Sequence, residues 1–156
     1  MSTNSSTISP RPFGPLAANA QRFATALHTS VYRLTGGKIG GRMVGSPVLL
    51  LTTIGRKSGL VRTVPLLYLP DGDRFALVAS NGGTAKHPQW WLNLQANPKA
   101  QIQVGPRSMT VTATRAEGEE RSRLWSKLVE MYPDYANYQK RTPRGIPVVI
   151  LQPLPM

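Results

Sequence analysis

The stretch PVLLLTTIGRKSGLVRTVPLLYL, residues 47–69, is the part of the sequence that decides the fold. Two segments rich in Val, Leu, Ile and Thr flank a polar interval at residues 55–59. This pattern is typical of a β-hairpin whose strands are largely buried. It predicts strands near residues 48–54 and 60–69, joined by a short polar tip.

The tip, GRKSG, has the composition of an anion-binding loop. Its two glycines let the backbone turn with positive φ, so that Arg56, Lys57 and Ser58 can direct their donors into one small volume. Arg62, on the returning strand, adds a third cation. We therefore predict that the tip holds a phosphate or a carboxylate; the alternative is that these polar side chains are only solvated.

The length and composition limit the remaining possibilities. A chain of 156 residues suits one domain with a single core, and we expect a flexible tail at residues 1–14 followed by one domain at residues 15–156. Cysteine is absent, and His28 and His87 lack the spacing of metal ligands, so no metal site is expected. No segment has the ~20 apolar residues of a membrane span, and the N-terminus lacks a signal-peptide pattern, so we expect a cytoplasmic protein.

The chain is strongly basic, with 19 Lys and Arg against 7 Asp and Glu, a net charge of +12. Such a charge predicts attraction to an anionic partner. Because the cations are spread from Arg11 to Arg144, and no aromatic and basic RNA-binding signature is present, we do not expect nucleic acid to be that partner.

Residues 15–34 are predicted to form an amphipathic helix that ends at Gly36. Its apolar side chains recur at three- and four-residue steps, at Leu16, Ala20, Phe23, Leu27, Val31 and Leu34. We favour packing of this apolar face on the core. The alternative is peripheral contact with the anionic inner face of a membrane, aided by Arg22 and Arg33.

The segments after the hairpin predict four more strands and two more helices. The strands are expected at residues 74–80, 100–104, 108–116 and 146–151, and the helices at residues 89–95 and 117–131. The strands at residues 48–54, 60–69 and 74–80 should follow one another as a meander. Because βαβ alternation is absent, we predict an α+β protein with a small antiparallel barrel and flanking helices.

Aromatic residues are further candidates for chemistry. Tyr132, Tyr135 and Tyr138 are three residues apart, so a helical turn would present their phenol groups to the same space. Phenol groups can stack on a ring and donate a hydrogen bond to an oxygen that becomes negative. Core packing is the alternative for these tyrosines, as it is for Trp90 and Trp91.

Most of the chain, residues 45–153, resembles the deazaflavin-dependent nitroreductase family, whose members use coenzyme F420 and reduce quinones. The resemblance rests on three strings in the family's order, LLLTTIGRKSGLVRTVPLLYLPDGDRFALVASNGG, KHPQWWLNLQANPKAQIQV and EERSRLWSKLVEMYPDYANYQKRTPRGIPVVILQP. It implies a flavin-reductase-like split β-barrel that binds F420 rather than FMN. The implied reaction is hydride transfer from reduced F420 to a quinone-like acceptor, with nitroaromatic compounds as further acceptors in some members.

The resemblance also implies roles for individual residues. The phosphodiester and oligoglutamate tail of F420 would be held by Arg56, Lys57, Ser58, Gly59 and Arg62. Contacts to the deazaflavin and its ribityl chain are implied for Ala79, Ser80, Asn81, Gly82, Trp90, Trp91 and Asn93. Tyr132, Tyr135 and Tyr138 match tyrosines on the acceptor side.

One departure from the family pattern supports a second hypothesis. Asn81 stands where nitroreductase-type relatives have Lys, which removes a cation from the coenzyme pocket. The alternative function is therefore a protein that binds or carries F420 or a related flavin without turnover. For the reductase, backbone amides at residues 80–83 would meet the polar edge of the ring. The resemblance favours a monomer.

Overall fold

The computed structural model describes residues 15–43 and 45–155, with side chains from residue 24 onward. The tail predicted at residues 1–14 lies outside this range. The helices are α1 (Pro15–Thr35), α2 (Gln89–Ala96), α3 (Gly118–Met131) and α4 (Asp134–Arg141), with a short 3₁₀ helix, η1 (Asn81–Gly83). The strands are β1 (Arg42–Met43), β2 (Ser46–Ile54), β3 (Val61–Leu67), β4 (Leu69–Asp71), β5 (Arg74–Val78), β6 (Lys99–Val104), β7 (Arg107–Arg115) and β8 (Val148–Pro153).

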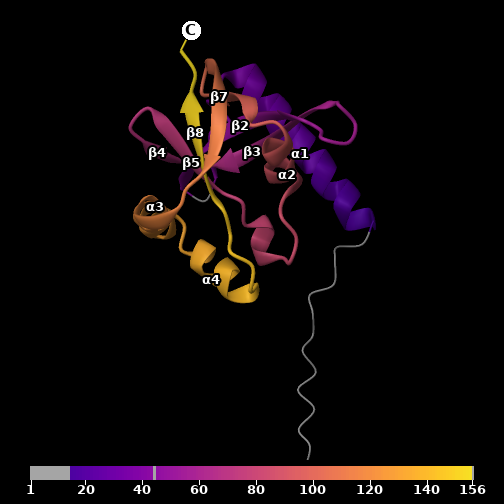
Figure 1. Ribbon diagram of the computed structural model, residues 1–156. Helices are drawn as coiled ribbons and strands as arrows, with labels where there is room; N and C mark the ends of the chain where they lie inside the picture. Colours follow the sequence, from indigo (N-terminus) through magenta and orange to yellow (C-terminus); the bar gives the residue numbers. More distant parts are fainter. Residues whose placement is uncertain (1–14, 44, 156) are drawn as a thin grey trace, which may run out of the picture.

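The strands form one antiparallel sheet in the order β1-β2-β6-β7-β8-β5-β4, with β3 also paired to β2. The sheet curls into a half-barrel with helices around it (Figure 1), which confirms the predicted α+β split barrel. Both predicted hairpins, β2–β3 and β6–β7, are present. The predicted meander is present in a broken form, because the strand expected at residues 60–69 is interrupted at Tyr68: β3 pairs with β2, and β4 pairs with β5. The buried strand β8 pairs with the other edge of β5.

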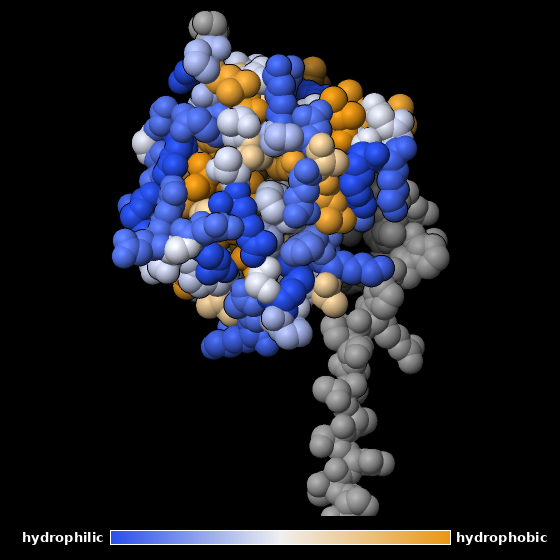
Figure 2. Space-filling model, in the orientation of Figure 1, coloured by the Kyte–Doolittle hydropathy of each residue, from blue (hydrophilic) through white to orange (hydrophobic). Residues whose placement is uncertain are grey.

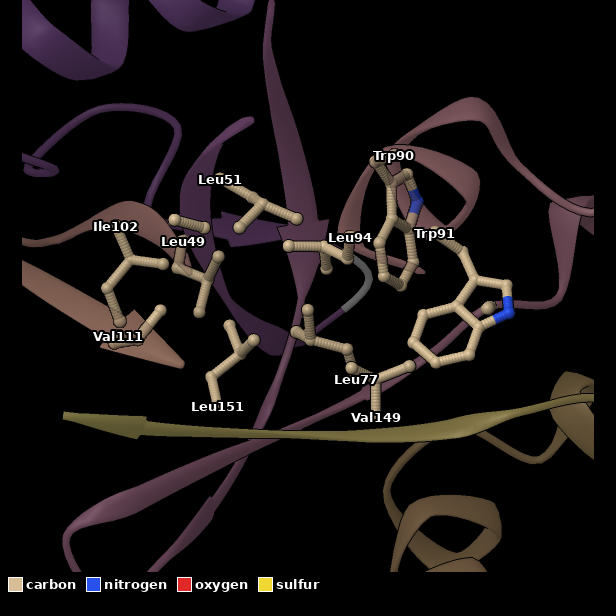
Figure 3. Close-up of a cluster of buried hydrophobic side chains, with 12 residues drawn as sticks. Leu49, Leu51, Leu77, Trp90, Trp91, Leu94, Ile102, Val111, Val149 and Leu151 are labelled. Atoms are coloured by element: carbon tan, nitrogen blue, oxygen red, sulfur yellow. The ribbon is translucent and has the colours of Figure 1, made fainter. Parts of the chain in front are cut away.

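The alternation of side chains along β2 divides the core into two layers. Leu49 and Leu51 point into the barrel, whereas Val48 and Leu50 face α1. The barrel interior (Figure 3) is filled by Leu49, Leu51, Leu77, Ala79, Trp90, Trp91, Leu94, Ala100, Ile102, Val111, Val149 and Leu151. A separate cluster joins α3 and α4 to the sheet, and it contains Leu124, Leu128, Tyr135, Ile146 and Ile150.

Helix α1 lies along the outside of the sheet, next to β3 (Figure 1). Tyr32 anchors it, packing against Val48 and Leu50 with 1% of its surface exposed. The Tyr32 hydroxyl donates to the carbonyl oxygen of Gln103 at 3.2 Å and accepts from the amide of Gly105 at 2.7 Å. The buried phenol is therefore satisfied by the turn between β6 and β7.

The predicted packing face of α1 is wrong for the part of the helix whose side chains are described. Leu27 and Leu34 are 56% and 87% exposed, whereas Thr29 and Tyr32 are buried. Tyr32 displaces the leucines because its ring fills the space over β2 while its hydroxyl finds two backbone partners. No helix in the described range is long and apolar enough to cross a membrane.

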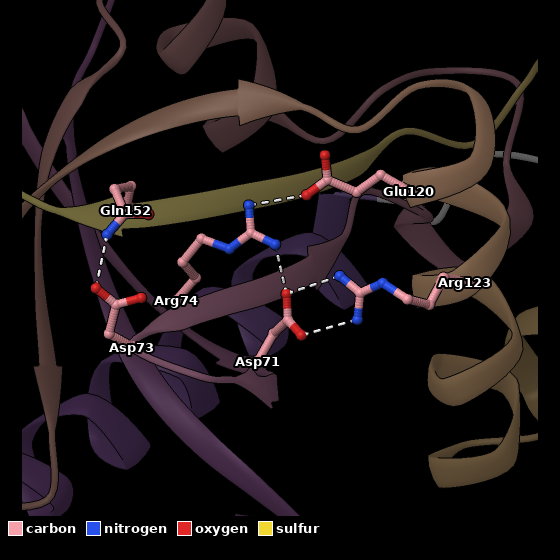
Figure 4. A network of polar contacts seen from close by, with 6 residues as sticks. All are labelled: Asp71, Asp73, Arg74, Glu120, Arg123 and Gln152. Carbon is pink, nitrogen blue, oxygen red and sulfur yellow. Dashed lines mark hydrogen bonds and ion pairs between the residues drawn. The ribbon is translucent and has the colours of Figure 1, made fainter.

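Two aspartates, two arginines and a glutamate gather where β4, β5 and α3 meet (Figure 4). Arg123 donates to both carboxylate oxygens of Asp71, at 2.9 and 3.1 Å. Arg74 pairs with Asp71 at 2.6 Å and with Glu120 at 2.8 Å, and Asp73 accepts a bond from Gln152 at 3.0 Å. Hydrophilic side chains cover most of the face shown in Figure 2, in keeping with a net charge of +12.

Candidate functional site

A cleft of about 1070 Å³ lies between the tip of the β2–β3 hairpin, helix α1 and the beginning of α2. The described residues that line it include four cations, Arg33, Arg56, Lys57 and Arg62, and no Asp or Glu. Ser58, Trp90 and Asn93 also line it. The structure thus brings together most of the residues that the sequence assigned to the coenzyme tail.

The tip keeps its shape through its own backbone. The amide of Gly55 donates to the carbonyl of Leu60 at 2.8 Å, and the amide of Gly59 donates back to Gly55 at 2.8 Å. Gly59 has a φ of 70°, a conformation that a residue with a side chain rarely adopts. The hydroxyl of Ser58 accepts from the Leu60 amide at 3.2 Å, so the predicted turn is held closed from within.

Asn93 on α2 fixes the direction of Arg56. Its Oδ1 accepts from the Arg56 amide at 3.2 Å and from the Arg56 guanidinium at 3.1 Å, while its Nδ2 donates to Thr53 Oγ1 at 3.1 Å. Gln89 accepts a further bond from the Arg56 guanidinium at 2.9 Å. The neighbouring cations Lys57 and Arg62 are exposed and, within the described chain, form no ion pair. Arg56 is thus oriented in advance, and the other two are open to a ligand.

The loop from Ala79 to Thr84 is closed by its own contacts. Ala79 and Ser80 are buried, and Asn81 has a φ of 47° and donates from Nδ2 to Thr84 Oγ1 at 2.9 Å. The amides of Gly83 and Thr84 donate to the carbonyls of Ser80 and Asn81. Asn81 therefore braces the loop, and among the amides at residues 80–83, which were expected to meet the ring, that of Gly83 already has a partner.

Arg144, which the sequence analysis did not single out, clamps this loop. Its guanidinium donates to four carbonyl oxygens, those of Ser80 at 2.7 Å, Thr84 at 2.9 Å, Lys86 at 3.3 Å and Ala79 at 3.4 Å. It also lies 3.1 Å from Nδ1 of His87. Because the guanidinium can only donate, His87 Nδ1 accepts and the proton of the neutral ring sits on Nε2. Burial, and then the nearby charges of Arg144 and Arg115, lowers the pKa of His87.

The two tryptophans belong to the barrel core and also border the site. Trp90 and Trp91 are 8% and 5% exposed, and only Trp90 lines the cleft. The indole nitrogen of Trp91 points away from the core cluster (Figure 3). This buried donor has no hydrogen-bond partner among the described residues.

The three tyrosines form one cluster, and none of them lines the cleft. Tyr132 and Tyr135 pack edge to face with ring centroids 4.8 Å apart, and Tyr135 is only 6% exposed. The hydroxyls of Tyr132 and Tyr138 lie 3.1 Å apart. This hydrogen bond, together with burial, raises the pKa of Tyr132, and burial raises the pKa of Tyr135. Both phenols are therefore neutral donors at ordinary pH.

Gly83 joins the tyrosine cluster to the Ala79–Thr84 loop. A Cβ atom at Gly83 would lie 2.7 Å from the carbonyl oxygen of Tyr138, so a side chain has no room there. The predicted site residues thus form two groups, the tip with Trp90 and Asn93, and the loop with the tyrosines. The segment from Lys86 through α2 connects them. No group of His, Asp or Glu that could hold a metal ion occurs within the described chain.

Similarity to known proteins identifies the family of this chain. The sequence profile of the F420H(2)-dependent quinone reductases matches residues 24–153. The chain belongs to the F420H(2)-dependent quinone reductase family. An F420H(2)-dependent quinone reductase of Mycobacterium tuberculosis is 46% identical over 129 residues, which cover 80% of this chain and 87% of the relative.

Solved structures agree with the quinone reductase family assignment. An F420-H2 dependent reductase, FDR-A, is 47% identical, covers 68% of this chain and 94% of its own, and superposes with a TM-score of 0.63. A second structure, described as a domain-swapped dimer, is 38% identical, covers 89% of this chain and all of its own, and has a TM-score of 0.66. The predicted family resemblance is confirmed, and because the family is F420H2-dependent, coenzyme F420 is the cofactor.

Proposed function

We propose that this protein transfers a hydride from reduced coenzyme F420 to a quinone-like acceptor. The observation that carries the proposal is the cleft, where four cations meet no Asp or Glu among the described lining residues. A polyanionic coenzyme tail supplies the charge that these cations lack. When bound, the deazaflavin supplies the hydride chemistry, and the protein supplies binding, orientation and electrostatics.

The tip residues would hold the anionic part of the coenzyme. Arg56 offers a guanidinium that Gln89 and Asn93 have already oriented, so little side-chain entropy is lost on binding. Lys57 and Arg62 add charge without a competing carboxylate. Asn93 thus acts mainly by positioning Arg56 and the tip.

The Ala79–Gly82 segment, together with Trp90 and Trp91, would border the ring. The buried tryptophans exclude water from that end of the cleft. The Arg144 clamp keeps the loop in one conformation before the coenzyme arrives.

The tyrosine cluster would serve the acceptor. A neutral phenol can donate a hydrogen bond to a quinone oxygen as that oxygen gains negative charge. Tyr132 and Tyr138 are half-buried, and their hydroxyls are paired, whereas Tyr135 is almost fully enclosed. Holding the acceptor against the ring can supply about 7–11 kcal/mol of a barrier. We assign the hydrogen bond to Tyr138, with Tyr132 orienting it.

The test is a fluorescence titration of the purified protein with oxidised F420 and, separately, with FMN, followed by reduced F420 with menadione. We expect saturable binding of F420 in preference to FMN, and oxidation that depends on menadione. Binding without oxidation would replace this function by that of a coenzyme carrier. Preference for FMN would overturn the cofactor assignment.

Conservative substitutions test the roles of the tyrosines. Tyr138→Phe should slow menadione reduction by about 10-fold or more, with F420 affinity unchanged, because only the hydroxyl is lost. Tyr135→Phe should also slow turnover if its hydroxyl reaches the acceptor, as the sequence suggested. An equal loss of F420 affinity in either variant would make that residue a coenzyme or packing contact instead.

The oligomeric state of the protein is part of the same proposal. The sequence favoured a monomer, but a relative of 38% identity is a domain-swapped dimer. We propose that this chain also dimerises, which would cover the exposed Leu27 and Leu34 of α1. Light scattering should give twice the chain mass of 17.1 kDa. A monomer that sediments with anionic vesicles would instead support the membrane contact considered from the sequence.

A further inference from the structure

Helix α1 forms one wall of the cleft that also contains the basic tip, and four of its five described lining residues are polar. Thr25, Thr29 and Arg33 follow one another at four-residue steps, which places them on one face of the helix. Ser30 also lines the cleft. The two walls therefore present hydroxyls and a guanidinium on one side and three cations on the other.

Thr29 carries a hydroxyl with no partner. The residue is 8% exposed, and its Oγ1 makes no hydrogen bond with the rest of the described chain. Threonines in helices commonly donate to the carbonyl four residues earlier, as Thr35 on the same helix does to Val31 at 2.7 Å. Because a buried hydroxyl without a partner is costly, Thr29 points to an acceptor that comes from outside the chain.

Arg33 stands one helical turn further along the same wall. One of its terminal nitrogens donates to Thr63 Oγ1 at 2.9 Å, and Thr63 in turn shares a hydrogen bond of 2.8 Å with Thr52. A guanidinium has five N–H groups, so this contact fixes the side chain and leaves donors for a ligand. No ion pair engages Arg33 within the described chain.

We infer that the Thr29–Arg33 face of α1 is a second binding wall for an anionic chain, namely the carboxylate-bearing glutamyl tail of the coenzyme. The inference rests on the proposed function. An apolar quinone side chain would leave the Thr29 hydroxyl and the Arg33 guanidinium without acceptors, whereas carboxylates accept from both. With cations on the facing wall, the tail is gripped between α1 and the hairpin tip.

The structure therefore assigns to α1 the selection of coenzyme by tail length. Contacts to a long tail should depend on α1, whereas the phosphodiester and ring should bind through the tip and the loop. Removing the α1 donors should then weaken a long-tailed coenzyme and leave a short-tailed one unaffected.

The test is a fluorescence titration of two F420 preparations, one with a long glutamyl chain and one with a single glutamate. Arg33→Gln should weaken the long form about 10-fold, and Thr29→Val about 5-fold, with little change for the short form. Lys38→Gln is the matched control, because it also removes one cation near the end of α1 but does not line the cleft. Thr29→Ser keeps the hydroxyl and should restore the long-tail affinity.

The outcomes separate this inference from the proposed function. Arg33→Gln and Thr29→Val proteins that bind both forms as the wild type does, or that lose the same factor for both, would overturn the α1 wall while the coenzyme assignment stands. A wild-type protein that binds neither form would overturn the proposed function and the inference with it. Circular dichroism of each variant excludes loss of the fold as the cause of weaker binding.

Discussion

The cations of this protein fall into two groups with opposite surroundings. Where β4 meets α3, Arg74 and Arg123 share the carboxylates of Asp71 and Glu120, and every ion pair within the described chain lies there (Figure 4). In the cleft, Lys57 and Arg62 meet no carboxylate among the described lining residues. The first group ties a turn to a helix, and we propose that the second binds a ligand. The net charge of +12 therefore includes two sets of cations with different surroundings.

The largest expected effect comes from the unpaired cations. We expect the double variant Lys57→Gln, Arg62→Gln to bind F420 about 100-fold more weakly, because each lost charge-assisted contact weakens binding by about 10-fold. Its free energy of unfolding should stay within about 0.5 kcal/mol of the wild type, since both side chains are exposed. Fluorescence titration and urea unfolding measure the two quantities.

The matched control for the cleft variant is Lys99→Gln, Arg107→Gln, which removes two exposed cations that do not line the cleft. It should retain F420 affinity at physiological salt. An equal loss of affinity in the control would mean that net charge, rather than the cleft, attracts the coenzyme.

Arg144 is an intermediate case, a cation whose partners are neutral carbonyls. Arg144→Ala should destabilise the fold by about 2 kcal/mol, because the carbonyls of Ala79 and Thr84 lose their donor. Arg144→Lys should recover only part of this, since Lys lacks the planar fork of donors. Urea unfolding gives the stability, and F420 titration shows whether the looser loop also weakens binding. Stability equal to the wild type for Arg144→Ala would show that the clamp is dispensable.

A substitution at Asp71 tests the role of the paired cations, Arg74 and Arg123. Its hydrogen bonds with Arg123 and then Arg74 hold the pKa of its carboxyl well below the ordinary value of 3.8. A depressed pKa contributes stability that is present above pH 3.8 and is lost as the pH falls below it. Asp71→Asn should cost about 1 kcal/mol at pH 7, a modest value because Arg123 is partly exposed to solvent. The loss in free energy of unfolding caused by Asp71→Asn should become smaller as the pH falls below 3.8.

The control for this variant is Asp73→Asn, because the Asp73 carboxylate accepts a hydrogen bond from Gln152 and forms no ion pair within the described chain. It should change the free energy of unfolding by less than Asp71→Asn does. F420 affinity should be unchanged in both. A loss of coenzyme affinity in Asp71→Asn would contradict the proposal that the paired cations stabilise the fold while the unpaired cations bind the coenzyme.

The smallest effect concerns His87, beside Arg144. Its pKa lies below the ordinary value of 6.5, so the unfolded chain binds its proton more readily than the folded one. The resulting contribution to stability is present above pH 6.5 and declines as the pH falls below it. His87→Gln should flatten the pH dependence of the unfolding midpoint between about pH 6.5 and pH 5. An unchanged profile would show that neither burial nor the nearby charge of Arg144 shifts the pKa of His87.

The structural elements that depend on local sequence patterns were predicted correctly. The hairpin, its GRKSG tip and most of the strands follow from alternation, glycine positions and runs of β-branched residues, and the structure places them within a few residues of the prediction. The residues alone indicated only that the ligand is anionic. The family resemblance identified this ligand as coenzyme F420.

Contacts between distant segments were not predictable in this way. The Arg144 clamp joins residues 57 to 65 positions apart, and nothing in the local sequence marks this arginine among 19 Lys and Arg. The face of α1 was misassigned because leucine periodicity was weighted above Tyr32, whose hydroxyl has its partners 71 and 73 residues away. The pairing of β5 with β8 depends likewise on the C-terminal strand.

The side chain of Asn93 has a consequence for the order in which the protein assembles. The strands of the β2–β3 hairpin are neighbours in sequence, so they can pair early during synthesis. The direction of the Arg56 side chain, however, depends on an amide 37 residues beyond Arg56 and 40 beyond Thr53. Arg56 therefore acquires its final orientation only once α2 has docked on the barrel. We expect a hairpin that has not yet met α2 to hold the coenzyme more weakly than the folded protein does.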